Sequence, residues 1–109
     1  MIIQNKFSNF IIPRRYNGIT IFPFIFLRTG TDANESLIRH EKIHIQQQLE
    51  CLLLGFVILY YYYYIKLRLQ GYKHDTAYRL IPFEREAYWC QNYTEYLKNR
   101  KRFAWSEWI

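Results

Sequence analysis

The stretch LIRHEKIHIQQQLE, residues 37–50, carries two histidines four positions apart, His40 and His44, with Glu41 directly after the first. It belongs to a run from residue 35 to residue 69 that contains no proline and whose apolar residues recur at helical spacing. On an α-helix, positions i and i+4 share one face, so both imidazoles can point at one site. The run therefore predicts a long helix that carries the two histidines side by side.

The pattern HExxH is typical of zinc sites on helices. Zn²⁺ accepts imidazole nitrogen at about 2.0–2.1 Å, and catalytic zinc sites combine three protein ligands with a water. His40 and His44 are the candidate ligands, and Glu41 is placed to accept a proton from metal-bound water. The alternative is a solvated polar helix face on which Glu41 pairs with Arg39 or Lys42. A third ligand elsewhere in the chain would favour the metal site.

The stretch PFEREAY, residues 82–88, supplies candidates for that third ligand. Pro82 fits the first turn of a helix, so we expect Glu84 and Glu86 at the start of a helix that continues to about Lys98. The two carboxylates lie about 200° apart on a helix, so only one can face the metal. Glu84 is preferred because Ala87 shares its face and permits close helix packing.

Together these two segments resemble the gluzincin family of zinc metallopeptidases, in which HExxH is followed by a glutamate on a later helix. HEKIHIQQQLE followed by FEREAY is also similar to a group of small uncharacterised bacterial proteins of about this length, over most of the chain. The resemblance implies a single minimal zincin-like domain over residues 1–109 with Zn²⁺ as cofactor. The implied zinc ligands are His40, His44 and Glu84. Glu41 is implied as the general base.

Other side chains near these motifs are candidates for supporting roles. Tyr88 stands where the family often has aspartate, so the acid that orients a ligand histidine must come from elsewhere, with Glu86 as the candidate. Gln47 or Gln48, on the turn after the second histidine, is expected to line the cleft. His74 lies in a charged loop and is expected to be solvated. Candidate oxyanion stabilisers are Tyr78, Arg79 and Tyr88.

The N-terminal region predicts β-structure. Residues 17–28, NGITIFPFIFLR, are rich in Ile and Phe and follow an Asn-Gly turn signal. Pro23 inside this run indicates an edge strand or two short strands. Residues 7–13 predict another short strand, paired across a turn at residues 16–18. The expected fold is mainly α (α+β), with a short N-terminal β-hairpin, the HExxH helix, an apolar helical hairpin and a C-terminal ligand-bearing helix.

The apolar run CLLLGFVILYYYYYI, residues 51–65, is shorter than the roughly twenty residues that span a bilayer. Its five consecutive tyrosines favour a membrane interface, where Lys66 and Arg68 would meet anionic headgroups. The alternative is a buried core helix. A shared metal site requires the chain to return to its starting side, so we expect the helix to break near Gly55 or to end before Leu69.

Net charge, cysteine spacing and the N-terminal sequence limit which partners and which cellular location are expected. The formal net charge is +6, with one dense basic run, KNRKRF at residues 98–103, but no recognition motif accompanies it, so nucleic acid is not expected as a partner. Cys51 and Cys90 are too far apart for a CxxC metal site. No cleavable signal peptide is predicted, which favours a cytoplasmic or peripherally membrane-associated protein, with membrane contact through residues 51–68. The aromatic tail RFAWSEWI, residues 102–109, is expected to pack back as a short helix or turn.

These observations favour a zinc-dependent hydrolase, specifically a metallopeptidase acting on a peptide or protein. In this interpretation Glu41 activates the zinc-bound water and an edge strand near Ile19–Leu27 holds an extended substrate. The alternative is a non-catalytic protein in which the metal staples a small fold and the aromatic arm contacts a partner or membrane. A third interpretation is a basic membrane-surface protein in which HEKIH is accidental.

Overall fold

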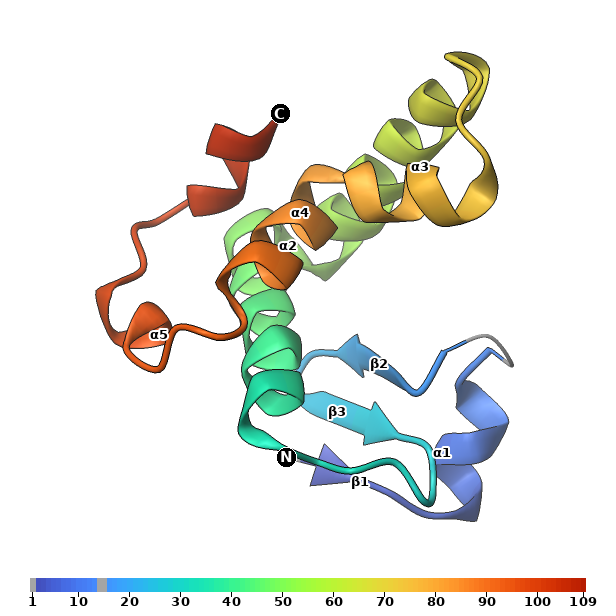
Figure 1. Cartoon of the computed structure of the whole chain (residues 1–109), viewed down its shortest axis with the longest axis vertical. Coiled ribbons are helices and arrows are strands. Elements are labelled where there is room, and N and C mark those ends of the chain that lie inside the picture. The colour runs from blue at the N-terminus through green and yellow to red at the C-terminus, as the bar shows by residue number, and fades with distance from the viewer. Residues whose placement is uncertain (1, 14–15) are drawn as a thin grey trace.

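The computed structural model describes residues 2–13 and 16–109. These residues form a mainly helical fold with a small three-stranded sheet, which confirms the expected mainly α (α+β) class. The long helix α2 (Glu35–Leu69) runs through the middle of the molecule, with the sheet and helix α1 beside its N-terminal end. Helix α4 (Pro82–Cys90) crosses α2, and the C-terminal segment lies on the other side from the sheet (Figure 1).

The sheet contains β1 (Ile2–Ile3), β2 (Gly18–Ile21) and β3 (Phe24–Leu27) in the order β1-β3-β2. Strand β3 is central, parallel to β1 and antiparallel to β2, with which it forms a hairpin. This is not the expected hairpin, which paired residues 7–13 with residues 17–28 across a turn at residues 16–18. Pro23 lies in the turn between β2 and β3, so the interpretation as two short strands is confirmed. Strand β2 lies at an edge of the sheet, next to α2, whereas β3 lies in the centre of the sheet. The expectation of an edge strand over Ile19–Leu27 therefore holds for its first half alone.

The strand predicted over residues 7–13 is wrong, because this segment forms helix α1 (Lys6–Ile11). The reason is a capping box at its start. The Asn5 side chain accepts a hydrogen bond from the Ser8 backbone N–H (3.0 Å), and the Ser8 hydroxyl accepts one from the Asn5 backbone N–H (2.8 Å). The same hydroxyl contacts the Leu27 carbonyl oxygen at 2.7 Å, which ties α1 to β3. Local capping thus overrides the β-preference of the apolar residues.

Helix α2 spans the predicted range but contains a sharp break. Asn34 caps its start by accepting a hydrogen bond from the Leu37 backbone N–H (2.9 Å). The break lies at Leu52 (φ 56°, ψ 152°). It was expected near Gly55, which lies three residues later. A positive φ with an extended ψ is a conformation that side chains with a Cβ rarely adopt, at a cost of roughly 1–3 kcal/mol. The break redirects the second half of α2, so that α4 can lie across the helix.

The chain returns through a second helix, whose bounds the sequence did not predict. Gly71, at φ 101°, lies in the turn after α2, and helix α3 (His74–Leu80) leads back towards α4. Helices α2 and α3 therefore form the expected helical hairpin. Helix α4 ends at Cys90 rather than near Lys98, and α5 (Tyr96–Asn99) follows as a separate short helix.

The core lies where α4 crosses α2. The Phe83 ring packs at a tilt against Phe56 of α2 and against Trp105, with ring centroids 4.5 and 4.7 Å apart. Trp105 belongs to the short 3-10 helix η1 (Ala104–Trp108), so the aromatic tail packs back as predicted. This packing fixes the first turn of α4 over the histidine-bearing face of α2.

Replacing Leu52 by glycine is expected to raise the free energy of unfolding by about 1 kcal/mol, because glycine adopts this backbone conformation without a Cβ penalty. The Leu52 side chain is 75% exposed, so little packing is lost. Leu54→Gly is the matched control, since Leu54 is 72% exposed on a regular turn, where glycine costs roughly 1 kcal/mol. Chemical denaturation should show shifts of opposite sign. Equal losses in both variants would contradict strain at Leu52.

Candidate metal centre

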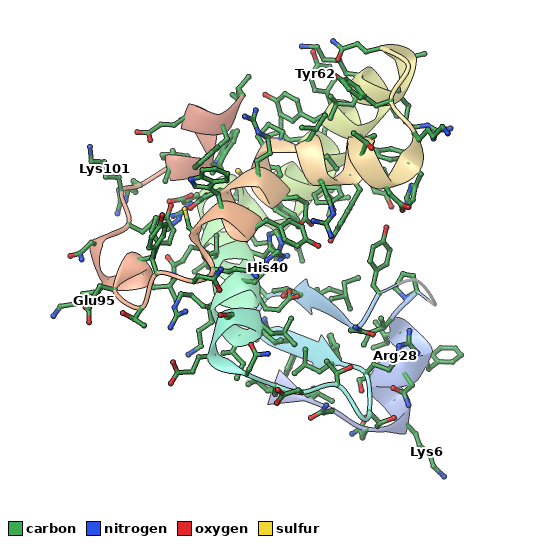
Figure 2. All side chains as sticks on the ribbon, in the orientation of Figure 1. Lys6, Arg28, His40, Tyr62, Glu95 and Lys101 are labelled. Atoms are coloured by element: carbon green, nitrogen blue, oxygen red, sulfur yellow. The ribbon has the colours of Figure 1, made fainter. Side chains whose placement is uncertain are left out.

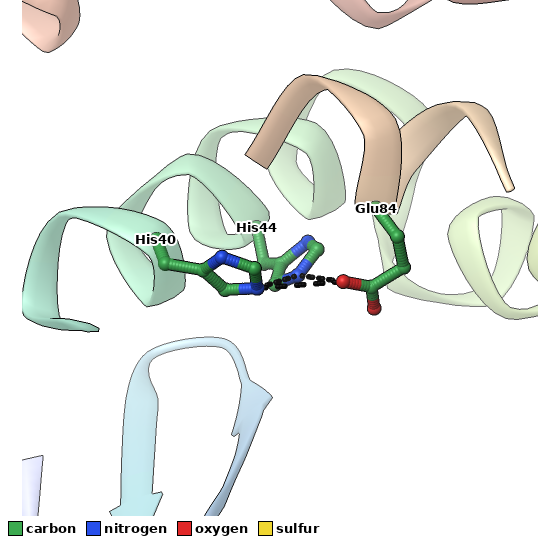
Figure 3. A group of neighbouring side chains, drawn as sticks. All are labelled: His40, His44 and Glu84. Atoms are coloured by element: carbon green, nitrogen blue, oxygen red, sulfur yellow. Dashed lines mark hydrogen bonds and ion pairs between the residues drawn. The ribbon is translucent and has the colours of Figure 1, made fainter. Parts of the chain in front are cut away.

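Three buried side chains from two distant segments meet at one point. His40 and His44 project from one face of α2, and Glu84 projects from the first turn of α4 (Figure 3). The Glu84 Oε1 atom lies 3.1 Å from His44 Nε2 and 3.4 Å from His40 Nε2, and the two nitrogens are 3.2 Å apart. Ligands bound at about 2.0–2.1 Å to a tetrahedral ion lie about 3.3 Å from one another. This group therefore has the spacing to hold a metal ion.

Glu86, the other candidate for the third ligand, points away from the imidazoles. Its carboxylate accepts hydrogen bonds from Arg100 Nε and from the Tyr96 hydroxyl, both at 2.6 Å. The expected angular separation of the two glutamates on the helix explains this division. The preference for Glu84 is thus consistent with the geometry, while metal binding itself remains a prediction.

The outer ring nitrogens of both histidines are held by amide side chains. His44 Nδ1 lies 2.7 Å from Gln47 Oε1, and His40 Nδ1 lies 2.8 Å from Gln91 Oε1. Gln47 Nε2 donates to the Phe83 carbonyl (3.0 Å) and to the Glu86 carboxylate, so the amide oxygen of Gln47 must be the atom that faces the His44 ring. His44 therefore donates from Nδ1, which leaves Nε2 as the ligand atom.

The Glu86 carboxylate orients this arrangement indirectly. Gln47 Nε2 donates to Glu86 Oε1 at 2.9 Å, so Glu86 acts on His44 through Gln47 rather than by direct contact. Arg100 bridges Glu86 to Glu50, with Arg100 Nη1 2.8 Å from Glu50 Oε2, and these two carboxylates raise the pKa of the guanidinium against the opposing effect of its burial. The predicted supporting acid is therefore present as part of a buried charge network.

We call His40, His44 and Glu84 the metal group. Glu41 is buried beside this group rather than paired with a basic side chain in solvent. The Thr20 hydroxyl of β2 donates a hydrogen bond to Glu41 Oε2. A Cβ atom at Gly18 would lie 3.0 Å from Leu27 Cδ2 and 3.2 Å from the Phe26 carbonyl oxygen, so the glycine permits close pairing with β3, and Glu41 Oε1 lies at ordinary contact distance from the same point. Arg39 instead donates to the Gln91 carbonyl at 2.6 Å. The alternative of a solvated polar helix face is therefore wrong.

Electrostatic interactions within the group favour a proton on His44 when no metal is bound. Burial alone would lower the pKa of His44, but the adjacent Glu84 carboxylate outweighs it and raises the pKa to about 9. Burial likewise opposes the charge of Glu84, but the facing imidazoles hold the pKa of that carboxyl well below its usual range. The Tyr60 hydroxyl donates to Glu84 Oε2 at 2.7 Å, which leaves Oε1 directed at the imidazoles. A metal ion would replace the shared proton.

A cavity of about 530 Å³ opens over the group. Its floor includes Glu41 as well as the two histidines and Glu84, and its walls are largely aromatic. The wall residues include Gln48, Leu53, Phe56, Tyr60, Tyr61 and Tyr78. The expectation that Gln47 or Gln48 lines the cleft is met by Gln48, while Gln47 lies behind His44. Such a concave, mostly apolar site with a few convergent polar groups is typical of ligand pockets.

The three candidate oxyanion stabilisers have different positions. Tyr78 lines the cavity, and burial raises its pKa far above the usual range, so its hydroxyl stays a neutral donor. The Tyr88 ring packs 4.5 Å from the His40 ring. The Arg79 guanidinium stacks over Tyr88, 4.7 Å from the ring centroid. Tyr78 is therefore the best placed of the three to meet a bound carbonyl.

His74 was expected to be solvated, but it is partly buried and both of its ring nitrogens are hydrogen-bonded. Its Nε2 atom lies 3.0 Å from the Tyr16 hydroxyl, and its Nδ1 atom lies 2.9 Å from the Tyr64 hydroxyl. It lines the cavity but stands outside the metal group of the described residues. Three further contacts were not indicated by any sequence spacing, namely those of Thr20, Tyr60 and Gln91 with the site.

Comparison with known proteins adds no assignment. No family model, no curated protein and no solved structure matches the chain. The function must therefore be inferred from the chemistry of the site.

In metal-free protein, the free energy of unfolding is expected to fall as the pH rises from 6.5 to about 9, because folded His44 keeps a proton that the unfolded chain releases near its ordinary pKa. The folded-state pKa is the higher one, so this stabilisation is complete below pH 6.5 and lost above about 9. The loss should be on the order of 3 kcal/mol. Urea denaturation in the presence of a chelator measures it.

The matched controls for this pH dependence are two histidine variants. His44→Gln should remove most of the slope, whereas His74→Gln should keep it because His74 does not contact Glu84. A free energy of unfolding that stays constant from pH 6.5 to 9 in the parent protein would disprove the charge pair.

Proposed function

We propose that this protein is a zinc-dependent hydrolase of the gluzincin type, specifically a metallopeptidase. The supporting observation is the spacing of 3.1–3.4 Å among two imidazole nitrogens and one carboxylate oxygen, at the floor of a cavity that Glu41 also lines. Among the described residues, no fourth His, Cys, Asp or Glu joins this group. Catalytic zinc sites keep the fourth position open for water or substrate, whereas structural sites are closed by four protein ligands.

The residues around the group fit this chemistry. Zinc held by His40, His44 and Glu84 would polarise a scissile carbonyl and lower the pKa of a bound water towards about 7. Glu41 is the proposed base. Its Oε2 atom is held by the Thr20 hydroxyl, which leaves Oε1 to accept the water proton and pass it to the leaving amine.

The edge of β2 is the proposed binding surface for an extended peptide. Gln48 already occupies part of this edge, since its Nε2 donates to the Thr20 carbonyl and its Oε1 accepts from the Phe22 N–H, both at 2.7 Å. The substrate backbone would therefore add at the Gly18 end of the strand, which lines the cavity beside Glu41. Tyr78 would donate to the carbonyl oxygen that becomes negative during attack.

A non-catalytic role is the second candidate, and one observation favours it. The metal group joins α2 to α4, and the Glu86–Arg100–Glu50 network extends that junction to the segment after α4. A bound ion would therefore also hold together the two halves of the fold. Turnover by the zinc-loaded protein separates the two functions.

Replacing Glu41 by glutamine is expected to leave zinc binding intact and to lower peptide hydrolysis by at least about 10²-fold, because the amide cannot accept the water proton. His44→Ala should lose both zinc and hydrolysis. Metal content is measured on purified protein by mass spectrometry, and hydrolysis is measured on a mixed peptide library.

His74→Gln is the control, because it replaces the one histidine outside the group and should keep stoichiometric zinc. Unchanged turnover in Glu41→Gln would contradict the assigned base. Zinc binding without turnover in the parent protein would favour the second candidate function.

A further inference from the structure

The second half of α2 exposes a continuous apolar stripe. Its members recur every three or four residues, which places them on one face of the helix, and their exposed fractions lie between 54% and 84%. We call this set the outer stripe, and its residues are Leu54, Ile58, Tyr61, Tyr62, Ile65 and Leu69. Figure 2 shows Tyr62 at the far end of the molecule, pointing outward. The opposite face of the same helix packs against the core through Phe56 and neighbouring residues.

The charge around the outer stripe has one sign. Between residues 51 and 73 the sequence contains no Asp or Glu, while Lys66, Arg68 and Lys73 are all exposed. Exposed apolar surface of this extent marks an interaction site in a soluble chain. A basic border favours an anionic partner, and tyrosine rings are suited to the headgroup level of a bilayer.

The outer stripe borders the cavity over the metal group. Leu53, Val57 and Tyr61 are exposed, and all three also line the cavity wall. They follow one another at intervals of four residues, so they form the row of α2 that adjoins the stripe. A surface that covers the outer stripe would therefore reach the rim of the cavity.

We propose that the outer stripe docks on the surface of an anionic lipid bilayer, and that the cavity over His40, His44 and Glu84 thereby receives polypeptide segments held at that surface. The second half of this proposal rests on the proposed hydrolase function. It assigns the substrate class as membrane-proximal polypeptide and the partner as anionic lipid.

The packing of α2 favours surface docking over a membrane span. By length and composition, α2 is the one helix of the described residues that could cross a membrane. However, its second half carries α3 on one side, with exposed Asp75 and Arg79, so lipid cannot surround it. An amphipathic segment with this arrangement lies in the interface plane. Docking of a second copy is disfavoured because the two basic borders would repel each other.

Vesicle flotation tests the docking surface without reference to activity. The protein is mixed with vesicles of phosphatidylcholine alone or of phosphatidylcholine with phosphatidylglycerol. We expect flotation with the anionic vesicles only. The double variant Ile58→Ser/Ile65→Ser should lose flotation, and Lys66→Gln/Arg68→Gln should weaken partitioning at least about tenfold.

The matched control for flotation is Phe10→Ser, which removes an apolar side chain that is 87% exposed on α1, away from the stripe. This variant should float like the parent protein, and circular dichroism checks that every variant is folded. Flotation that survives the stripe substitutions would overturn the docking proposal, as would absence of flotation in the parent. A dimer in sedimentation equilibrium that the stripe variant dissociates would assign the stripe to a second copy instead.

A paired cleavage assay tests the substrate class. One peptide is presented either free in solution or anchored to anionic vesicles by an acyl chain. The zinc-loaded parent should cleave the anchored form at least about tenfold faster, and the stripe variant should lose this difference while keeping its rate on the free peptide. Equal rates on both forms would overturn the substrate class. Cleavage of neither form, together with normal flotation, would overturn the hydrolase function and leave the docking surface supported.

Discussion

The fold depends on the buried contact between the imidazoles of α2 and the Glu84 carboxylate of α4. Removing a carboxylate and an imidazolium from water is costly, and their attraction offsets that cost only when their other polar atoms are also hydrogen-bonded. Tyr60 contacts the second carboxylate oxygen, and Gln47 and Gln91 contact the outer ring nitrogens. The remaining atoms face one another at 3.1–3.4 Å, a distance that either a shared proton or a metal ion can bridge.

A second buried charge pair carries this constraint to the C-terminal segment. The Arg100 side chain is only 4% exposed and bonds both Glu86 and Glu50, and Gln47 connects Glu86 to His44. A half-satisfied buried network is more costly than an apolar core, so the chain after α4 must fold back to complete it. The basic run that contains Arg100 is therefore partly structural, although its composition alone suggests surface charge.

The parts of the site that the sequence predicted are those set by local helix geometry. Spacing of four along α2 was enough to place the two histidines together, and the angle between neighbouring turns separated Glu84 from Glu86. The contact of Thr20 with Glu41 joins a strand to a helix, and no spacing encodes it. Helix α1 was missed because a side-chain capping box outweighed apolar composition. The break in α2 lies at Leu52, within one turn of Gly55, near which it was expected, but the residue with the positive φ is a leucine rather than the glycine.

The chemistry of the site and the exposed surface of α2 belong to one structural unit. A chain of 109 residues has little material for a separate cleft, and here the second half of α2 serves as core, cavity wall and outer surface at once. Tyr60 lies on the inner face of this segment and fixes Glu84 through its hydroxyl. The inner face of this helix thus positions a candidate ligand, while its outer face carries the apolar surface proposed to meet the bilayer.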